Sequence, residues 1–410
     1  MVQLAPIFSK SENKVLLGLE RVRKILSYFG NPQECFQSCV VTGTVGKGQI
    51  ATNIAHNLSY FGKIGLYTSP HLERFSERIK ILHFGKEREI SEDEIFEISN
   101  LVFSAEKRLG VELTYFEHAT VMAFLWFKEN GIDFASLEVG MGGRLDAVST
   151  ANAKLGVISK IHFDHMNYLG ESLYDIAYEK ALCVPAESTR ITMHKPGDVQ
   201  FEAIRDVSNG RIINDFYVKD FGFENVDSFF LKGRLMVSYD EDILVNFFGP
   251  YGFIENSVLS SVSSHLILKE FFDIARNDLF FDIRLVKGRV ERKGNFIYDG
   301  GHNPASAEFL SKTLPNMVFV VAFMKDKDWK SFIKILKDKI DYLYITRVHN
   351  ERALSPEDIK SFTDDLGINS EIILIDEIPK VVSRISNLVC FTGTFYLYKV
   401  FKDTFRVAGF

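Results

Sequence analysis

A glycine-rich stretch with a single lysine, at residues 43–49, holds the residue types that point most directly to chemistry in this chain. It lies between an apolar run and a helical pattern, and Gly43, Gly46 and Gly48 let backbone N–H groups approach an anion closely. Lys47 is long enough to reach the outer phosphates, and the positive end of the following helix would face the same place. The stretch therefore predicts a phosphate-binding loop whose ligand is a nucleoside triphosphate.

The stretch departs from the general phosphate-loop pattern. In the pattern GxxxxGK[ST] the glycines stand farther apart and a hydroxyl residue follows the lysine, whereas here two residues separate Gly43 from Gly46 and Gly48 follows Lys47. From these residues alone, the alternative interpretation is a glycine-rich turn between a strand and a helix that binds no ligand.

Polar residues that can bind ligands also follow other predicted strands in the first half of the chain. Ser69 comes after the strand expected at 63–68, Glu138 lies in the one at 134–139, and Asp164 and His165 follow the one at 155–161. The carboxyl ends of parallel strands line the ligand crevice of a doubly wound sheet. Mg²⁺ prefers oxygen ligands, so Ser69 and Glu138 suit it and His165 is a less typical ligand. For each residue taken singly, the alternative is a loop hydroxyl or a hydrogen-bonded histidine.

Strand-like runs alternate with helical patterns up to about residue 190, which is typical of an α/β domain. A helical pattern from Leu16 to Gly30 opens the chain, and further helices are predicted at 50–60, 91–109 and 117–129. The helix at 91–109 begins with the capping-box pair Ser91 and Glu94. Between 190 and 250, short alternating segments predict β-hairpins and loops.

A second series of strands and helices begins near residue 281, after a boundary that we place at 276–278. Strands are expected at 296–298, 318–323, 342–346 and 372–375, and helices at 305–314, at 329–336 and after Ser355-Pro356. We therefore expect an α/β fold of two domains. Residues 1–280 would form a large P-loop ATPase-like domain with a parallel-rich sheet and a β-rich part, and residues 281–410 a smaller Rossmann-like domain.

The composition is that of an ordinary globular enzyme. Of the 410 residues 46% are hydrophobic, and Lys and Arg total 48 against 54 for Asp and Glu, which argues against a nucleic-acid binder with a broad basic surface. The four cysteines form no CxxC pair and stand among apolar residues, as expected of reduced core thiols. Neither a signal segment nor a membrane-length apolar run is evident. We expect a cytoplasmic monomer with no nucleic-acid or membrane partner.

A dozen short motifs, in order along nearly the whole chain, resemble those of folylpolyglutamate synthase, including the bifunctional dihydrofolate synthase type, in the ATP-dependent muramyl-peptide ligase superfamily. The longer ones are Gly43-Thr-Val-Gly-Lys-Gly48, Tyr67-Thr-Ser-Pro-His71, Leu113-Thr-Tyr-Phe-Glu117, Glu138-Val-Gly-Met-Gly-Gly-Arg-Leu-Asp-Ala147, Asp299-Gly-Gly-His-Asn-Pro304 and Phe391-Thr-Gly-Thr394. The shorter ones are Gly30-Asn-Pro-Gln33, Glu77-Arg-Ile79, Asp164-His165, Glu179-Lys-Ala181, Gly288-Arg289 and Lys327-Asp328.

The resemblance implies an ATP-driven ligase that joins L-glutamate to the carboxylate of a folate. The first domain would bind ATP and folate, and the second would add nucleotide and glutamate contacts. The implied ATP-binding residues are Gly43, Thr44, Gly46, Lys47, Gly48, Gln49, Asn256, Arg289 and Asp299. The implied Mg²⁺ ligands are Ser69, Glu138 and His165, the folate-binding residues are Thr114, Phe116, Asp146 and Ala147, and the glutamate-binding residues are His302 and Thr394. Taken alone, Phe116 could be a core residue and Thr394 the end of a strand.

The implied reaction gives a role to each catalytic residue, namely Lys47, Lys180 and His302. ATP phosphorylates the folate carboxylate, Lys47 and Mg²⁺ offset the charge, and the glutamate amine attacks the acyl phosphate beside His302. The resemblance also implies that Lys180 carries a carbamate, which forms only from a neutral amine. From spacing alone, the alternative is an exposed Lys180 paired with a nearby acid.

Two positions of the glycine-rich loop depart from the pattern of similar enzymes, and several alternatives stay open. Val45 stands where Asn is usual and Gln49 where Ser is usual, although backbone N–H groups do not depend on either side chain. Dihydropteroate is an additional or alternative acceptor. A muramyl nucleotide is a further alternative acceptor, although the motifs at 113–117 and 142–146 favour folate. A non-catalytic nucleotide-binding regulator is the alternative from another class of protein.

Overall fold

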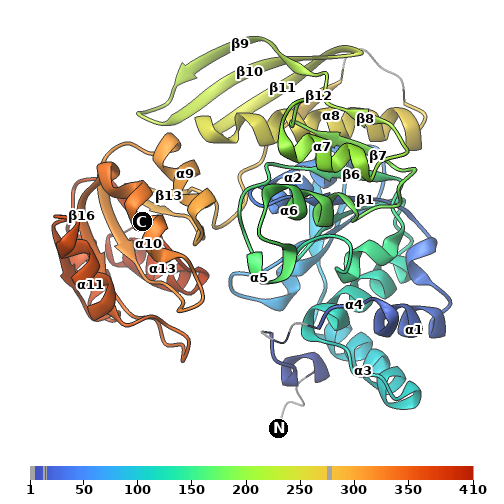
Figure 1. The fold of residues 1–410 in the computed structure, drawn as a ribbon, viewed down its shortest axis with the longest axis horizontal. Coiled ribbons are helices and arrows are strands. Elements are labelled where there is room, and N and C mark those ends of the chain that lie inside the picture. The colour runs from blue at the N-terminus through green and yellow to red at the C-terminus, as the bar shows by residue number, and fades with distance from the viewer. Residues whose placement is uncertain (1–4, 13, 15, 275–278, 410) are drawn as a thin grey trace. The chain divides into compact units, whose positions relative to one another are not determined.

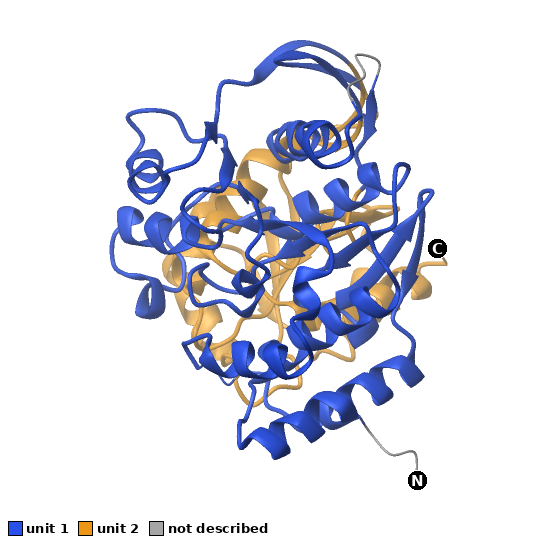
Figure 2. Cartoon of the chain, turned by 90° about the vertical axis from the view of Figure 1, so that its right-hand side faces the viewer, with its two compact units in different colours: residues 1–222, 234–246, 255–284 blue, residues 223–233, 247–254, 285–410 orange. Residues whose placement is uncertain are grey.

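The computed structural model describes residues 5–12, 14, 16–274 and 279–409, and these form two compact units (Figures 1 and 2). Unit 1 comprises 1–222, 234–246 and 255–284, and unit 2 comprises 223–233, 247–254 and 285–410. The boundary predicted at 276–278 lies outside the described residues. The assignment of 1–280 and 281–410 to two functional domains stays a prediction.

Unit 1 is built on an eight-stranded sheet in the order β4-β3-β2-β5-β1-β6-β7-β8. All pairs are parallel except β2 with β3 and β3 with β4. The central strands β1, β5 and β6 are buried along nearly their whole length, as expected of parallel strands covered on both faces. The strands are β1 Gln37–Thr42, β2 Ile64–Tyr67, β3 Ile79–His83, β4 Lys86–Glu89, β5 Phe134–Glu138, β6 Leu155–Ile158, β7 Thr189–Thr192 and β8 Ile212–Ile213. This parallel-rich sheet confirms the predicted fold class.

The helices of unit 1 follow the predicted pattern with two corrections. The opening helix begins at Glu20 rather than at Leu16, and a helix, α7, occupies part of the segment expected to form only hairpins and loops. The capping box of α3 is confirmed, since Ser91 and Glu94 bond each other's backbone N–H groups. The helices are α1 Glu20–Tyr28, α2 Lys47–Leu58, α3 Glu92–Leu109, α4 Tyr115–Glu129, α5 Met166–Leu169, α6 Leu173–Ala181, α7 Val199–Asp206 and α8 Ile254–Phe271.

A four-stranded sheet, in the order β12-β11-β10-β9, forms the β-rich part (Figure 1). Its strands are β9 Tyr217–Asn225, β10 Phe230–Tyr239, β11 Glu241–Pro250 and β12 Phe280–Asp282. β12 is an edge strand and pairs in parallel with β11. The hairpins predicted before residue 250 are therefore present, and β12 joins them from a distant part of the sequence.

Unit 2 contains a six-stranded sheet in the order β13-β14-β18-β15-β16-β17, parallel except for β13. The sequence analysis missed its inner strand β18 and placed the last predicted strand at 372–375, whereas β17 ends at Ile372. The strands are β13 Glu291–Lys293, β14 Phe296–Tyr298, β15 Met317–Val321, β16 Ile340–Ile345, β17 Ser370–Ile372 and β18 Val389–Thr392. The helices are α9 Pro304–Thr313, α10 Trp329–Leu336, α11 Pro356–Asp365, α12 Ile378–Val382 and α13 Tyr398–Val407.

The cysteine thiols are free. Cys39, Cys183 and Cys390 are buried as expected, but Cys35 is exposed, so the prediction of a core thiol is wrong for that residue. None of the described helices is long and apolar enough to cross a membrane.

The α3 cap generates a stability prediction. Ser91→Ala should lower the free energy of unfolding by about 1 kcal/mol, because the Glu94 N–H loses its side-chain acceptor. Ser104→Ala is the matched control, since the exposed Ser104 hydroxyl bonds only the Asn100 carbonyl within the same helix. Urea unfolding of both variants measures the difference, and equal losses would contradict the role of the cap.

Candidate functional site

The loop between β1 and α2 has a conformation that requires glycine at two positions. Gly43 and Gly46 have φ angles of +133° and +86°, which L side chains rarely adopt. A Cβ atom on Gly43 would collide with Ser159 Oγ, and one on Gly46 would lie 2.5 Å from Asn256 Nδ2. Neighbouring residues therefore pack directly on the loop backbone, and the predicted ATP-binding residue Asn256 is one of them.

The segment after β6 holds the loop by hydrogen bonds to its backbone. Thr44 N–H donates to the Lys160 carbonyl at 2.8 Å, and the Thr44 hydroxyl bonds both the N–H and the carbonyl of His162. Ser159 Oγ donates to the Val45 carbonyl at 2.7 Å. Val45 contributes only its backbone carbonyl to this contact, so the Val45 side chain does not take part in it.

Two lysines from different helices donate to one carbonyl of the loop. Lys47 Nζ and Lys180 Nζ lie 3.2 and 2.9 Å from the Gly43 oxygen. Lys180 is only 2% exposed, so the alternative of an exposed lysine is wrong. Burial, together with the nearby Lys47 charge, lowers the pKa of Lys180 to about 7. The loop thus brings together the two lysines that were predicted to be catalytic, and a neutral Lys180 amine is accessible near neutral pH.

Two of the predicted metal-binding residues meet beside this loop. Ser69 N–H donates to Glu138 Oε2 at 2.8 Å, and a Cβ atom on Gly48 would lie 3.2 Å from the same oxygen. The Glu138 carboxylate therefore lies against the first turn of α2. His165 immediately precedes α5, with its Nε2 3.7 Å from Asp164 Oδ1. The described part of the chain contains no group of three or more His, Cys, Asp or Glu side chains that could hold a metal ion.

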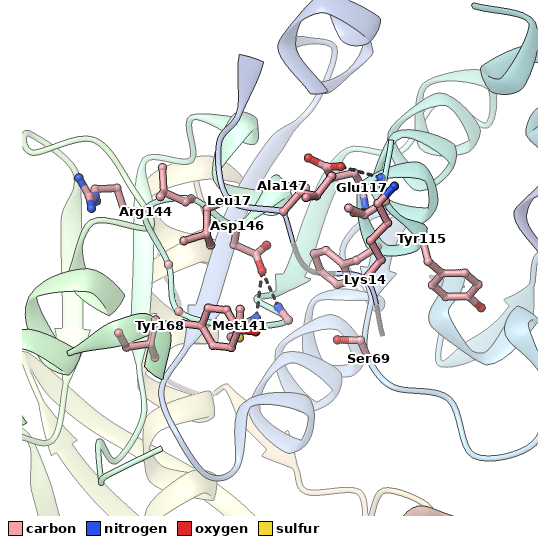
Figure 3. A pocket seen from close by; sticks show the side chains of 18 of the residues that line it. Lys14, Leu17, Ser69, Tyr115, Glu117, Met141, Arg144, Asp146, Ala147 and Tyr168 are labelled. Atoms are coloured by element: carbon pink, nitrogen blue, oxygen red, sulfur yellow. Dashed lines mark hydrogen bonds between the residues drawn. The ribbon is translucent and has the colours of Figure 1, made fainter. Parts of the chain in front are cut away.

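A cavity of about 360 Å³ in unit 1 is lined by all four of the predicted folate-binding residues (Figure 3). Thr114 and Phe116 come from the start of α4, and Asp146 and Ala147 from the glycine-rich turn after β5. Ser69 also lines the cavity, so its wall reaches the residues beside the loop. The sequence signal for this cavity was the pair of motifs at 113–117 and 138–147.

Asp146 holds the glycine-rich turn in place. Its carboxylate accepts N–H groups of Gly140 and Met141, both at 3.0 Å (Figure 3). It also accepts the Val148 N–H at 2.9 Å. Burial raises the pKa of Asp146 to about 6, although the three N–H groups favour its charged form. In the same turn a Cβ atom on Gly143 would lie 2.5 Å from the Glu179 carbonyl oxygen, so the turn packs closely on α6, which carries Lys180.

Arg78 is a cavity residue to which the sequence analysis gave no role. It is 5% exposed, donates from Nε to His71 Nδ1 at 2.7 Å, and has its guanidinium 5.2 Å from the centre of the Tyr115 ring. Glu117, another lining residue, pairs with Arg21 at 2.8 Å. The only sequence signal for Arg78 was its place in the motif Glu77-Arg-Ile79.

Unit 2 brings its predicted site residues together around the Phe395 ring. The Arg289 guanidinium lies 5.2 Å and the His302 ring 5.6 Å from the centre of that ring. Buried Asp299 accepts the N–H groups of Val290 and Gly301, and burial raises its pKa while Arg289 opposes the rise. Thr394 precedes Phe395, and its hydroxyl accepts the Tyr396 N–H at 3.4 Å.

Gln49, the last of the predicted loop residues, is buried, and its side chain donates to the Arg284 carbonyl. Its predicted phosphate contact is therefore left to its backbone N–H. The roles of these site residues stay predictions.

Comparisons with known proteins identify the family of the chain and its fold. Residues 286–391 match the family model described as "Mur ligase, glutamate ligase domain". The dihydrofolate synthase/folylpolyglutamate synthase of Buchnera aphidicola subsp. Acyrthosiphon pisum is 30% identical over 335 residues, which cover 78% of this chain and 77% of that protein. The dihydrofolate synthetase of Saccharomyces cerevisiae is 28% identical, and the match covers 91% of this chain and 92% of that protein.

Solved structures share the fold. The structure described as an FPGS–AMPPCP–folate complex has a TM-score of 0.78 at 23% identity, with 97% of each chain covered. Mycobacterium tuberculosis folylpolyglutamate synthase, solved with ADP and AMPPCP, has a TM-score of 0.77 at 22% identity, with 93% of this chain and 94% of that chain covered. The chain belongs to the dihydrofolate synthase/folylpolyglutamate synthase family, as its motifs predicted.

Proposed function

We propose that this protein is an ATP-dependent ligase that adds L-glutamate to a folate and so converts folates to polyglutamates. The observation that carries the proposal is that three features of unit 1 lie next to one another. A glycine loop holds Lys47 and Lys180, the Glu138 carboxylate lies against the same loop, and a cavity lined by Asp146 begins beside it. Family membership supports the same activity.

In the proposed reaction the folate carboxylate oxygen attacks the γ-phosphorus of ATP, giving an acyl phosphate and ADP. Lys47 lies at the loop where it offsets the negative charge of the transferred phosphoryl group. The glutamate amine then attacks the acyl carbon, phosphate leaves, and the amine loses a proton as the amide forms. His302 and Thr394 are the residues we assign to the incoming glutamate.

The residues beside the loop fit a magnesium ion. The Glu138 carboxylate lies against Gly48, and Ser69 is hydrogen-bonded to it, so oxygen donors are available where phosphates would bind. We assign Ser69, Glu138 and His165 to hold the ion, which when bound supplies positive charge next to the phosphates. A cytoplasmic location and a monomeric state remain part of this proposal.

Dihydropteroate is a second proposed acceptor. Several relatives are named for both activities, and the Saccharomyces cerevisiae relative is named for dihydrofolate synthesis alone. Glutamate addition to dihydropteroate uses the same activation of a carboxylate, so the loop chemistry is unchanged. A panel of dihydropteroate, tetrahydrofolate and its one-carbon forms, with labelled glutamate, identifies the preferred acceptor.

Phosphate release should require both a folate-type acceptor and glutamate. The acyl phosphate forms only on the acceptor, and glutamate completes the turnover. The assay contains ATP, the acceptor and labelled glutamate, and it measures released phosphate and labelled amide. Each component is omitted in turn, and a muramyl nucleotide is the control acceptor. ATP binding without amide formation on any acceptor would favour a non-catalytic nucleotide-binding regulator instead.

Lys47→Ala should lower turnover by about 100-fold or more, because the transferred phosphoryl group loses a positive charge that no neutral side chain replaces. Lys154→Ala, which removes an exposed lysine of unit 1, is the matched control and should retain wild-type turnover. Steady-state kinetics and circular dichroism separate chemistry from folding. A folded Lys47→Ala protein with more than about a tenth of wild-type turnover would contradict the role of Lys47.

We further propose that Lys180 is carbamylated. Its buried amine reacts with CO₂ to give an N-carboxylate and a proton, and its pKa of about 7 leaves much of the amine neutral at neutral pH. The carbamate supplies an oxygen ligand where an ammonium would repel a metal ion. Because the neutral amine is the reactive form, carbamylation is favoured above pH 7 and lost below it.

Lys180→Ala should be nearly inactive and should regain part of its turnover with acetate, a small carboxylate that substitutes for the carbamate. Wild-type enzyme stripped of CO₂ should recover with bicarbonate faster at pH 8 than at pH 6, and labelled bicarbonate should give a carbamate carbon NMR signal that Lys180→Ala lacks. Full activity of Lys180→Ala together with the absence of that signal from the wild type would rule out the carbamate.

A further inference from the structure

One face of α2, the helix that begins at Lys47, carries three carboxamide side chains. Gln49, Asn53 and Asn57 are four residues apart, which places them on the same side of the helix. They are only 2%, 0% and 3% exposed, so this polar row is buried. We call these three side chains the carboxamide ladder.

The carboxamide ladder bonds the backbone of one extended segment, residues 282–284. Asn57 Oδ1 accepts the Asp282 N–H at 3.1 Å, and Asn53 Oδ1 accepts the Arg284 N–H at 2.9 Å. Gln49 Nε2 donates to the Arg284 carbonyl. Because a carboxamide can donate and accept, the ladder pairs with the segment much as a neighbouring strand would.

The ladder covers an edge that the sheet leaves unpaired. β12 is the edge strand of its sheet, and on its inner side Ile283 N–H donates to the Asn246 carbonyl of β11 at 3.2 Å. Successive N–H groups of an extended chain point to opposite edges, so Asp282 and Arg284 face away from β11. The segment is therefore held by β11 on one edge and by α2 on the other.

The bonded segment is also where the chain leaves unit 1. Unit 1 ends at Arg284, and Leu285 begins the long C-terminal part of unit 2. Gln49 lies in the first turn of α2, two residues after Lys47. The ladder thus joins the loop helix directly to the exit of the chain.

The polar character of the ladder has a cost in packing. Gln49 Oε1, Asn53 Nδ2 and Asn57 Nδ2 are buried and have no hydrogen-bond partner among the described residues. Buried polar atoms without partners destabilise a fold, so an apolar face on α2 would pack more favourably. The carboxamides are therefore better explained by the backbone groups that they hold than by stability. A serine at position 49 would be too short to reach the Arg284 carbonyl.

We propose that the carboxamide ladder couples nucleotide binding at the loop to the exit segment 282–284, with Gln49 as the positioning residue. This inference rests on the proposed function, because it assigns the two units to one reaction. Nucleotide binding orders the first turn of α2, which includes Gln49. The hydrogen bond from the Gln49 side chain then restricts the motion of the Arg284 carbonyl. The exit segment is then fixed while the acyl phosphate awaits glutamate.

Amide hydrogen exchange tests the coupling without requiring turnover. In the wild type, a non-hydrolysable ATP analogue should slow exchange at Asp282 and Arg284 about tenfold more than at Ile283, which is held by β11. In Gln49→Met, which keeps the length but removes the donor, this extra slowing should fall below about twofold. Calorimetry gives the analogue affinity of each protein, and exchange is compared with every protein saturated by the analogue, so that a weaker affinity is not mistaken for a lost response.

Two further variants keep the test decisive. Gln49→Glu also cannot donate to the Arg284 carbonyl and should lose the extra slowing, so it replaces Gln49→Met if that protein does not fold. Asn246→Ala is the matched control, since it removes the side-chain bond to Asp282 Oδ1 on the opposite edge and leaves the ladder intact. It should retain the wild-type response.

The second readout is the number of ADP molecules formed per amide, which should rise several-fold in Gln49→Met as the acyl phosphate is lost to water. Undiminished slowing of Asp282 and Arg284 exchange in both Gln49 variants, or its absence from the wild type, would overturn the coupling. If the wild type made no amide, the proposed function would fail while the exchange data would still decide whether the ladder responds to nucleotide.

Discussion

The backbone carbonyl of Gly43 is the point on which the arrangement of the site depends. It accepts hydrogen bonds from both Lys47 and Lys180, so two amines share one acceptor in a buried setting. Burial penalises the charged form of Lys180, and the nearby charge of Lys47 lowers its pKa further, to about 7. The hydrogen bond to the loop therefore holds Lys180 in a place where its neutral form is accessible near neutral pH.

That shared carbonyl requires α6 to lie close to the loop, and the glycine-rich turn after β5 makes this possible. Gly143 leaves room for the carbonyls of Glu179 and Lys180, and Asp146 holds the turn through three backbone N–H groups. Asp146 also lines the cavity. The cavity wall, which would contact an acceptor, thus packs against α6, the helix that carries Lys180.

Sequence reasoning could place the residues at strand ends because parallel strands deliver their carboxyl ends to one edge of a sheet. Ser69 follows β2 and Glu138 ends β5, and the two strands are neighbours, so the predicted pair meets. What it missed depends on distant partners. β18 is a run of four residues whose burial comes from β14 and β15 on either side. Periodicity alone does not distinguish so short an apolar run from a buried helical segment.

The two departures in the loop show why the type of a residue alone does not decide its role. Val45 is held through its carbonyl by Ser159, so the loop shape survives a change of side chain at that position. Gln49 acts through its side chain, and its partner Arg284 is 235 residues away in sequence. A sequence pattern records only that both positions differ from those of similar enzymes. The hydrogen bonds distinguish Val45, where only the backbone carbonyl is used, from Gln49, whose side chain links α2 to the segment at which the chain leaves unit 1.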